Sequence, residues 1–244
     1  MTSVSNAAVG AYLAGNAAAK ARHGMNEAIA RLSTGVRAMY GGDAAGASVG
    51  HSMRADGRGA LMAARNVEDG ISFLQAGEAA LLEIAALNTR LRELAVQDLN
   101  AAFLDANQEA AITAEETAVA AAGNAIDAST LNDTALLTAG IAFVRDMDGA
   151  TTSFGAAADL TLASGITAVD REMGKIAKAL GSMAAGIAAL KGHQGTLYAL
   201  SANAEAAAAR IQDTDFARSS ANLAKFSILN QSAMAMVSQA NQAN

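Results

Sequence analysis

The chain has 244 residues and a net charge of −6 at pH 7, and it contains no cysteine, proline or tryptophan. Without cysteine it can form neither a disulfide framework nor a thiolate metal site, and without a basic run nucleic acid is not expected as a partner. Hydrophobic residues make up 52% of the chain but aromatic residues only 4%. Because small side chains bury little area each, we expect surface to be buried along long helices rather than in one thick core.

The N-terminal segment, residues 1–20, lacks the basic region followed by an apolar run that a secretory signal peptide has. No window of about 18 uninterrupted apolar residues occurs, so no membrane span is expected. A first helix is predicted over residues 4–34, with an apolar stripe at Met25, Ile29, Leu32 and Val36. Its first half is mostly alanine and polar residues, so alone in water this helix would be marginal.

Residues 37–46 interrupt the helical pattern, because Gly41 and Gly42 can end one helix and Asp43 can cap the next. The second helix is predicted to run to about Leu99, with a kink or break expected at residues 55–60 because Gly57 and Gly59 weaken it there. Its stripe steps by three, four and seven through Val67, Ile71, Leu74, Leu81, Ile84, Leu87, Leu91 and Leu94. Gly70 and Gly77 cost about 1 kcal/mol each against alanine, and we expect close helix–helix contact to compensate.

A stripe of that length needs a partner of equal length. Residues 166–210 supply one, because apolar residues recur there in a heptad seam at Ile166, Val169, Met173, Ile176, Leu180, Met183, Ile187 and Leu190. The pattern predicts an antiparallel coiled coil between the N- and C-terminal regions. An ordinary compact helical bundle is the alternative that periodicity leaves open.

Between these helices a third is predicted from Asp105, a candidate N-cap with Gln108 three residues on, to about Ala128. Helical periodicity is then lost over residues 130–164. Two strands are expected there, Ile141–Arg145 and Thr151–Phe154, with Asp148 and Gly149 in the turn. An irregular loop is the alternative.

The last helix is expected to begin with Asp213 or Thr214 as its N-cap. Its stripe is Leu223, Phe226, Leu229, Ala233 and Val237. The predicted fold is therefore mostly α, a long antiparallel helical bundle or coiled coil with a small β-hairpin region in the middle. We expect two domains: residues 1–40 plus 213–244 as an inner pair of terminal helices, and residues 41–212 as a helical rod.

No catalytic, cofactor or metal site is expected. His23, His51 and His193 lie far apart in the sequence, with no carboxylate spaced to complete a metal site. Nucleotide-binding and nucleophile-elbow motifs do not occur. Glu115 and Glu116 are interpreted as residues of a solvated helix face. The chain is therefore interpreted as a non-enzyme.

Six short motifs, in this order and spacing, resemble the terminal regions of bacterial flagellins. In the N-terminal half they are LSTGVR at Leu32–Arg37, GDAAG at Gly42–Gly46, RNVEDGIS at Arg65–Ser72 and RELAVQ at Arg92–Gln97. In the C-terminal half they are ARIQDTDFA at Ala209–Ala217 and SQANQ at Ser238–Gln242. Each motif alone is weak, but together they are specific and span most of the chain.

The resemblance implies a structural subunit that polymerises into the bacterial flagellar filament for motility and is secreted to the cell exterior. The implied partners are other copies of the chain, the flagellar export apparatus and its chaperone, and the hook-associated and cap proteins. The terminal helices would form the filament core through Met25, Ile29, Leu32, Leu223, Phe226, Leu229 and Val237.

Three departures from the family pattern stand out. The middle is short, as in a form without the variable outer domains, and Asp43 follows a glycine where the family commonly has a second aspartate. Family members usually continue for about ten residues, roughly three helical turns, beyond SQANQ. A hook–filament junction protein is the nearest alternative, but such proteins tend to have a proline near GDAAG. A soluble coiled-coil binding module is the alternative from another class.

The family resemblance also singles out one surface. Arg90, Leu94 and Gln97 are three or four residues apart and are expected to share a helix face. In flagellins this segment resembles the surface read by the animal Toll-like receptor for flagellin, together with a glutamate on the neighbouring helix, near Glu115 or Glu116. Subunit contacts within the filament are the alternative role for the same face.

Overall fold

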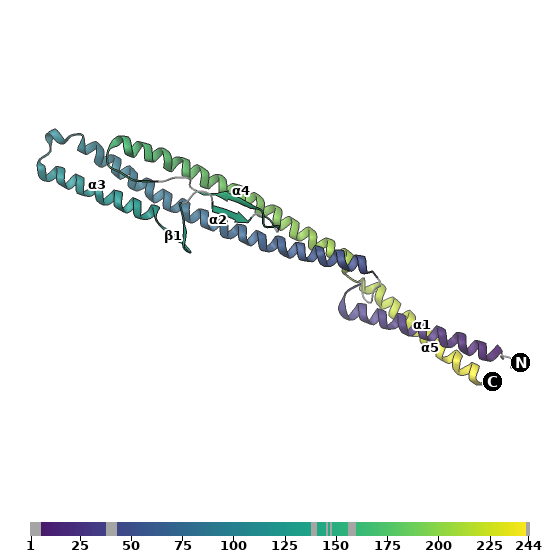
Figure 1. Ribbon diagram of the computed structural model, residues 1–244. Coiled ribbons are helices and arrows are strands. Elements are labelled where there is room, and N and C mark those ends of the chain that lie inside the picture. The colour runs from purple at the N-terminus through teal and green to yellow at the C-terminus, as the bar shows by residue number, and fades with distance from the viewer. Residues whose placement is uncertain are drawn as a thin grey trace. The chain divides into compact units, whose positions relative to one another are not determined.

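The computed structural model describes residues 6–37, 43–137, 141–144, 146, 148–155 and 160–242, and this part of the chain is mostly helical (Figure 1). The helices are α1 Asn6–Thr34, α2 Ala44–Asp98, the short 3-10 helix η1 Ala101–Phe103, α3 Ala106–Asp127, α4 Ile166–Gln212 and α5 Phe216–Gln242. The predicted helices are confirmed with closely similar ends, and α2 runs through residues 55–60 without a break. Gly41, Gly42 and Arg145 lie outside the described residues.

Two small antiparallel hairpins follow α3. Strand β3, Ile141–Val144, pairs with β4, Thr151–Phe154, which confirms the predicted strands within the described residues. The other hairpin pairs β1, Thr130–Leu131, with β2, Thr134–Ala135, and it was not predicted from the sequence. Its turn places Asn132 at φ 50° and Asp133 at φ 60°, the left-handed pair that a type I′ turn requires and that Asn and Asp tolerate.

The described chain forms two compact units. One contains Met1–Ala55 and Asn203–Asn244, and the other contains Asp56–Ala202. This division falls inside α2 and α4, whereas the predicted domains change at residues 40/41 and 212/213. The predicted domains concern which segments act together in an assembly and remain a prediction.

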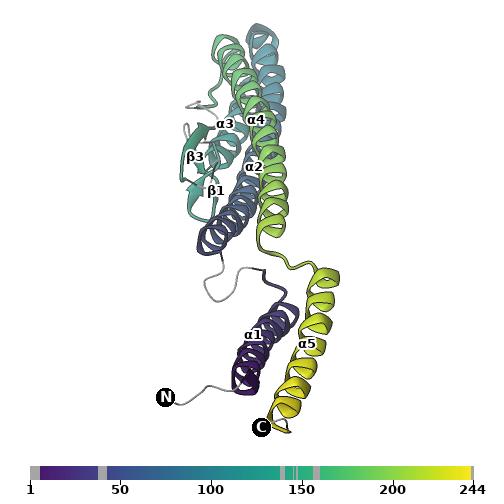
Figure 2. The ribbon, with the colours of Figure 1, turned by 90° about the vertical axis from the view of Figure 1, so that its right-hand side faces the viewer.

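In the second unit, α2 and α4 lie side by side in both views (Figures 1 and 2). The predicted stripe of α2 is buried, with Leu74, Leu81, Ile84 and Leu91 at 0% exposure, and it packs in one cluster with the seam residues Val169, Ile176, Met183 and Leu190 of α4. Leucines from the connection between α3 and α4 complete this core: Leu136, Leu137, Leu160 and Leu162. The antiparallel pairing predicted from two distant stripes is confirmed.

By length and composition alone α2 could cross a membrane, since one 18-residue window reaches a mean hydropathy of 1.3. The core helix of a water-soluble protein passes the same test. One third of that window is buried in the fold, and the apolar stripe of α2 packs against α4.

In the first unit, short backbone contacts tie the residues that follow α1 to the end of α4 and the start of α5. Val36 forms an antiparallel bridge with Asp213, the Thr214 N–H donates to the Gly35 carbonyl at 2.8 Å, and the Arg37 N–H donates to the Gln212 carbonyl at 2.7 Å. The N-cap prediction for α5 is therefore wrong. Asp215 directly precedes the first residue of α5, takes that role and accepts from the Arg218 N–H at 3.0 Å. The backbone pairing of Asp213 with Val36 and of Thr214 with Gly35 keeps both of these residues outside the helix.

Asp43 caps α2, as predicted, and accepts from the Gly46 N–H at 2.8 Å and from Arg37 at 2.8 Å. These two hydrogen bonds hold the pKa of the Asp43 carboxyl below its ordinary value. The Arg37 guanidinium also donates to the Ile211 carbonyl. The cap of α2 and the end of α4 are thus joined through one arginine.

Candidate assembly surfaces

Helices α1 and α5 form an antiparallel pair, with the first turn of α1 and the last turn of α5 at the same end of the pair (Figure 2). The face between them is built from small residues: Ala18, Ala21 and Ala28 on α1, and Ser219 and Ala233 on α5 are buried. The ring of Phe226 lies so close to Gly24 that a Cβ there would come within 2.6 Å of it. Small side chains allow the two helices to approach closely, but they bury little apolar area.

The sequence-predicted filament-core residues lie on or beside this contact. Met25, Leu32, Leu223, Phe226 and Val237 are half-buried. Ile29 and Leu229 remain 47% and 46% exposed. The pair therefore leaves part of its predicted apolar stripe uncovered.

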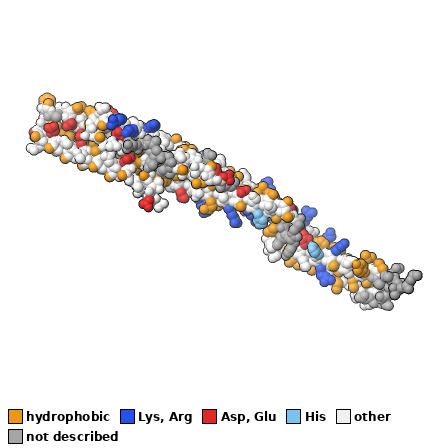
Figure 3. Space-filling view, viewed as in Figure 1, with side chains coloured by type: hydrophobic (Ala, Val, Ile, Leu, Met, Phe, Trp, Pro, Cys, Tyr) orange, Lys and Arg blue, Asp and Glu red, His pale blue; other side chains and the backbone are white. Residues whose placement is uncertain are grey.

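More apolar residues are exposed on this pair than the stripe accounts for. They are Val9, Tyr12, Leu13, Phe216, Ile228, Met234 and Met236, between 45% and 72% exposed. Figure 3 shows hydrophobic side chains at the surface of this part of the chain. Their helical positions place them on both sides of the α1–α5 contact. The positions on α5 can be compared by their rotation about the helix axis, with Ala233 facing α1 as the reference. Leu229 and Met236 are rotated about 40–60° to one side of Ala233. Leu223 and Met234 are rotated about 80–100° to the other side. The pair thus presents apolar flanks in two directions.

On the second unit, α3 packs beside α2 and brings Glu115 to Arg90. The Arg90 guanidinium donates to Glu115 at 2.6 Å and to Glu93 at 2.8 Å. These two partners, Glu115 first, raise the pKa of Arg90 above its ordinary value. Of the two glutamates that the sequence left open, the structure places Glu115 beside Arg90. Gln97 is also exposed.

Two residues of this predicted surface are buried. Leu94 is 1% exposed and lies within the second unit, so its side chain does not share an accessible face with Arg90. Glu116 is 7% exposed, and the prediction that it sits on a solvated face is wrong. Burial, and then the nearby Asp98 carboxylate, raise the pKa of Glu116. Nothing in the spacing of α3 distinguishes Glu116 from Glu115, because both flank its apolar positions.

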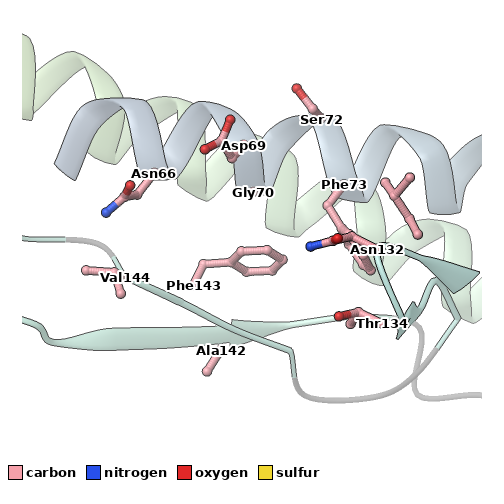
Figure 4. A pocket seen from close by; sticks show the side chains of 11 residues that line it. Asn66, Asp69, Gly70, Ser72, Phe73, Asn132, Thr134, Ala142, Phe143 and Val144 are labelled. Atoms are coloured by element: carbon pink, nitrogen blue, oxygen red, sulfur yellow. The ribbon is translucent and has the colours of Figure 1, made fainter. Parts of the chain in front are cut away.

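A shallow groove of about 440 Å³ lies between α2 and the β-hairpins (Figure 4). Its walls include Phe73 and Phe143, whose ring centroids are 6.3 Å apart, and polar residues such as Asp69 and Asn132 line its edge. The Phe143 ring also fills the space beside Gly70, where a Cβ would meet it at 2.6 Å. The close contact expected at Gly70 is therefore with a strand residue rather than with a helix. Among the residues that the structure describes, no group of three His, Cys, Asp or Glu is placed to hold a metal ion.

The fold is that of a helical structural protein that associates with other protein chains. Its long helices are paired, its terminal helix pair is rich in alanine, and apolar residues are exposed on both sides of that pair. The protein-family model of the bacterial flagellin N-terminal helical region matches residues 6–142. The protein-family model of the bacterial flagellin C-terminal helical region matches residues 166–244. The chain belongs to the bacterial flagellin family. It is a structural subunit of the flagellar filament.

Similar proteins span nearly the whole chain. A flagellin of Halalkalibacterium halodurans is 31% identical over 88% of this chain and 88% of its own length. The flagellar filament core protein flaB2 of Brachyspira hyodysenteriae is 31% identical over 90% of each chain. A flagellin of Bacillus subtilis is 27% identical over 87% of this chain and 88% of its own. The predicted resemblance to flagellin is confirmed, and no finding favours a junction protein.

Proposed function

We propose that α1 and α5, with the adjoining residues 1–40 and 213–244, form the core of the filament, and that residues 41–212 form the layer around it. The observation that carries this proposal is the pair of apolar flanks on the α1–α5 hairpin. A hairpin with one apolar side would be satisfied by a single partner. Two flanks give each subunit a neighbour on either side, and such heterologous contacts extend into a helical assembly rather than closing as a dimer.

Assembly in this proposal is coupled to ordering of the terminal helices. The contact between α1 and α5 is made of small residues and buries little area, so most of the apolar stabilisation becomes available only when neighbouring subunits cover the flanks. The terminal pair of the free subunit would then be weakly held, and its helicity would rise on polymerisation. A soluble coiled-coil binding module would instead be fully helical as a dilute monomer, so circular dichroism before and after polymerisation separates the two functions.

The decisive experiment removes α5 from the hairpin or places a charge on one of the hairpin's flanks. Deleting Thr214–Asn244 should leave a soluble protein that no longer polymerises in a sedimentation assay. Leu229→Asp should raise the critical concentration for polymerisation strongly, since it places a charge on an apolar flank. Ser220→Asp adds the same charge at an exposed polar position of α5 and is the matched control. Normal filaments from the truncated chain would refute the proposal, and equal effects of the two aspartates would show that charge alone is responsible.

The remaining partners and the route to the cell exterior follow from membership in the flagellin family. We propose that the chain leaves the cell unfolded through the flagellar export apparatus with a chaperone, and that it assembles between hook-associated and cap proteins. The absence of cysteine suits a chain that must pass such a channel without forming crosslinks. We also propose that it has no catalytic role.

We keep in the proposed receptor surface only those residues whose side chains are exposed. Arg90, Gln97 and Glu115 are accessible on the free subunit, and arginine is a common contributor to binding hot spots. Leu94 would act by holding α2 in place beneath them. Because the same residues can contact a neighbouring subunit, recognition of free subunits and assembly are compatible roles for one face.

A further inference from the structure

The chain has ten methionines and no cysteine, so thioethers are its only oxidisable sulfur groups. Among the described methionines, Met62, Met234 and Met236 are more than half exposed, at 53%, 51% and 58%. Met183, by contrast, is fully buried in the α2–α4 core. Of the methionines that the structure describes, an oxidant in solution therefore reaches these three most readily, and two of them lie on α5.

Met234 and Met236 lie on opposite flanks of the α1–α5 contact. Ala233, which precedes Met234, is 8% exposed and faces α1. Met234 follows Ala233 by one residue and Met236 follows it by three. At 3.6 residues per turn, these steps rotate the two side chains about the helix axis in opposite directions from Ala233. Each flank of the proposed filament-core hairpin therefore carries one accessible thioether. Methionine is flexible and polarisable, which suits a surface that must fit a neighbouring subunit.

We propose that Met234 and Met236 are oxidation sites that decide whether a subunit can join the filament. A peroxide transfers one oxygen atom to the sulfur: the new S–O bond forms, the O–O bond breaks, the sulfur loses two electrons, and the peroxide is reduced to water. The methionine sulfoxide is polar, and placing it against an apolar neighbour leaves its oxygen without a hydrogen-bond donor. Oxidised subunits are excluded from the assembly, and the exclusion is reversible by methionine sulfoxide reductases.

This inference rests on the proposed role of the α1–α5 flanks, and it makes a prediction about each methionine separately. In the free subunit, Met62, Met234 and Met236 should be oxidised at comparable rates, and Met183 much more slowly. In the filament, Met234 and Met236 should become protected because a neighbour covers them. Met62 lies on α2, outside the terminal hairpin, where its sulfur contacts the Arg65 guanidinium at 3.9 Å, and it serves as an internal reference.

The experiment treats purified full-length monomer with hydrogen peroxide to partial oxidation, removes the peroxide with catalase, and then induces polymerisation. Filaments and free protein are separated by sedimentation, and peptide mass spectrometry measures the sulfoxide fraction at each methionine. We expect sulfoxide at Met234 and Met236 to be depleted in the pellet about tenfold relative to the supernatant, and sulfoxide at Met62 to be distributed evenly. Equal fractions at Met234 and Met236 in pellet and supernatant would overturn the inference.

A variant gives a second, independent measurement. Replacing both α5 methionines, Met234→Leu with Met236→Leu, removes the oxidisable sulfur atoms from the flanks. The critical concentration of this variant should therefore be the same with and without peroxide treatment, whereas that of Met62→Leu should rise on treatment as much as that of the parent chain. Reductase treatment of the oxidised parent should restore polymerisation. If the double variant loses polymerisation on oxidation as the parent does, other residues are responsible and the inference fails. Failure of the untreated parent to polymerise would instead refute the proposed function.

Discussion

Gly77 lies on the buried side of α2, against Met183 of α4 and the backbone of Leu136. A Cβ at this position would meet the Met183 methyl carbon at 2.7 Å and the Leu136 carbonyl oxygen at 3.1 Å. Met183 is fully buried and has little room to move, and the carbonyl belongs to the backbone. Gly181 on α4 is its matched control, because a Cβ there meets nothing within 4 Å.

Of the two glycine-to-alanine substitutions, Gly77→Ala should give the less stable protein. Each gains about 1 kcal/mol of helix propensity, so Gly181→Ala should stabilise the protein by that amount. Gly77→Ala gains the same amount but overpacks the α2–α4 contact, which costs about 1–3 kcal/mol. Because the propensity gain is common to both, the difference between the variants isolates the overpacking cost of about 1–3 kcal/mol. For a protein of this size, each kcal/mol corresponds to about 2–4 °C in Tm.

The assay is thermal and urea unfolding of the monomer followed by circular dichroism. Adding Met183→Leu, which withdraws the clashing methyl carbon, should recover part of the loss in the Gly77→Ala background. A double-mutant cycle then measures the coupling between the two positions directly. A Gly77→Ala variant that is as stable as Gly181→Ala would refute the reasoning that helix proximity explains this glycine.

Four further predictions follow from the described residues. Replacing Asp146–Ser153 with a short glycine linker should leave polymerisation intact, because the hairpin is expected to face outward; loss of filaments from a folded protein would contradict this. Glu116→Gln should raise Tm at pH 7. Because folding raises the pKa of Glu116, the protonated carboxyl stabilises the fold below its ordinary pKa of 4.5. That contribution is lost as pH rises through the pKa of the folded protein. The gain should therefore vanish in acid, and a pH-independent gain would exclude titration as its cause. Arg90→Ala should weaken receptor signalling by free monomer with little loss of stability, since its partners are exposed; an unchanged response would remove Arg90 from that surface. Leu94→Ala should instead cost about 2–5 kcal/mol of stability because its side chain is buried, and a Tm equal to that of the parent would show otherwise.

The sequence by itself determined the helices and their partners. An apolar stripe that steps by three, four or seven residues over many helical turns is a local signal with few alternatives. The stripes from Val67 to Leu94 and from Ile166 to Leu190 are of similar length. The cap of α3 was equally local: Asp105 and Gln108 form the reciprocal capping box that their spacing predicts. The order of short motifs was enough to indicate the family, because their spacing over most of the chain is specific.

Only the tertiary structure decided which polar residues are covered. Glu115 and Glu116 are equivalent in sequence, yet the packing of α3 beside α2 places one against Arg90 and buries the other. The cap of α5 moved to Asp215 because Thr214 donates to Gly35, a contact between segments far apart in the chain. Local periodicity specifies which face of a helix is apolar, but the cover over its polar face depends on long-range packing that no single segment encodes.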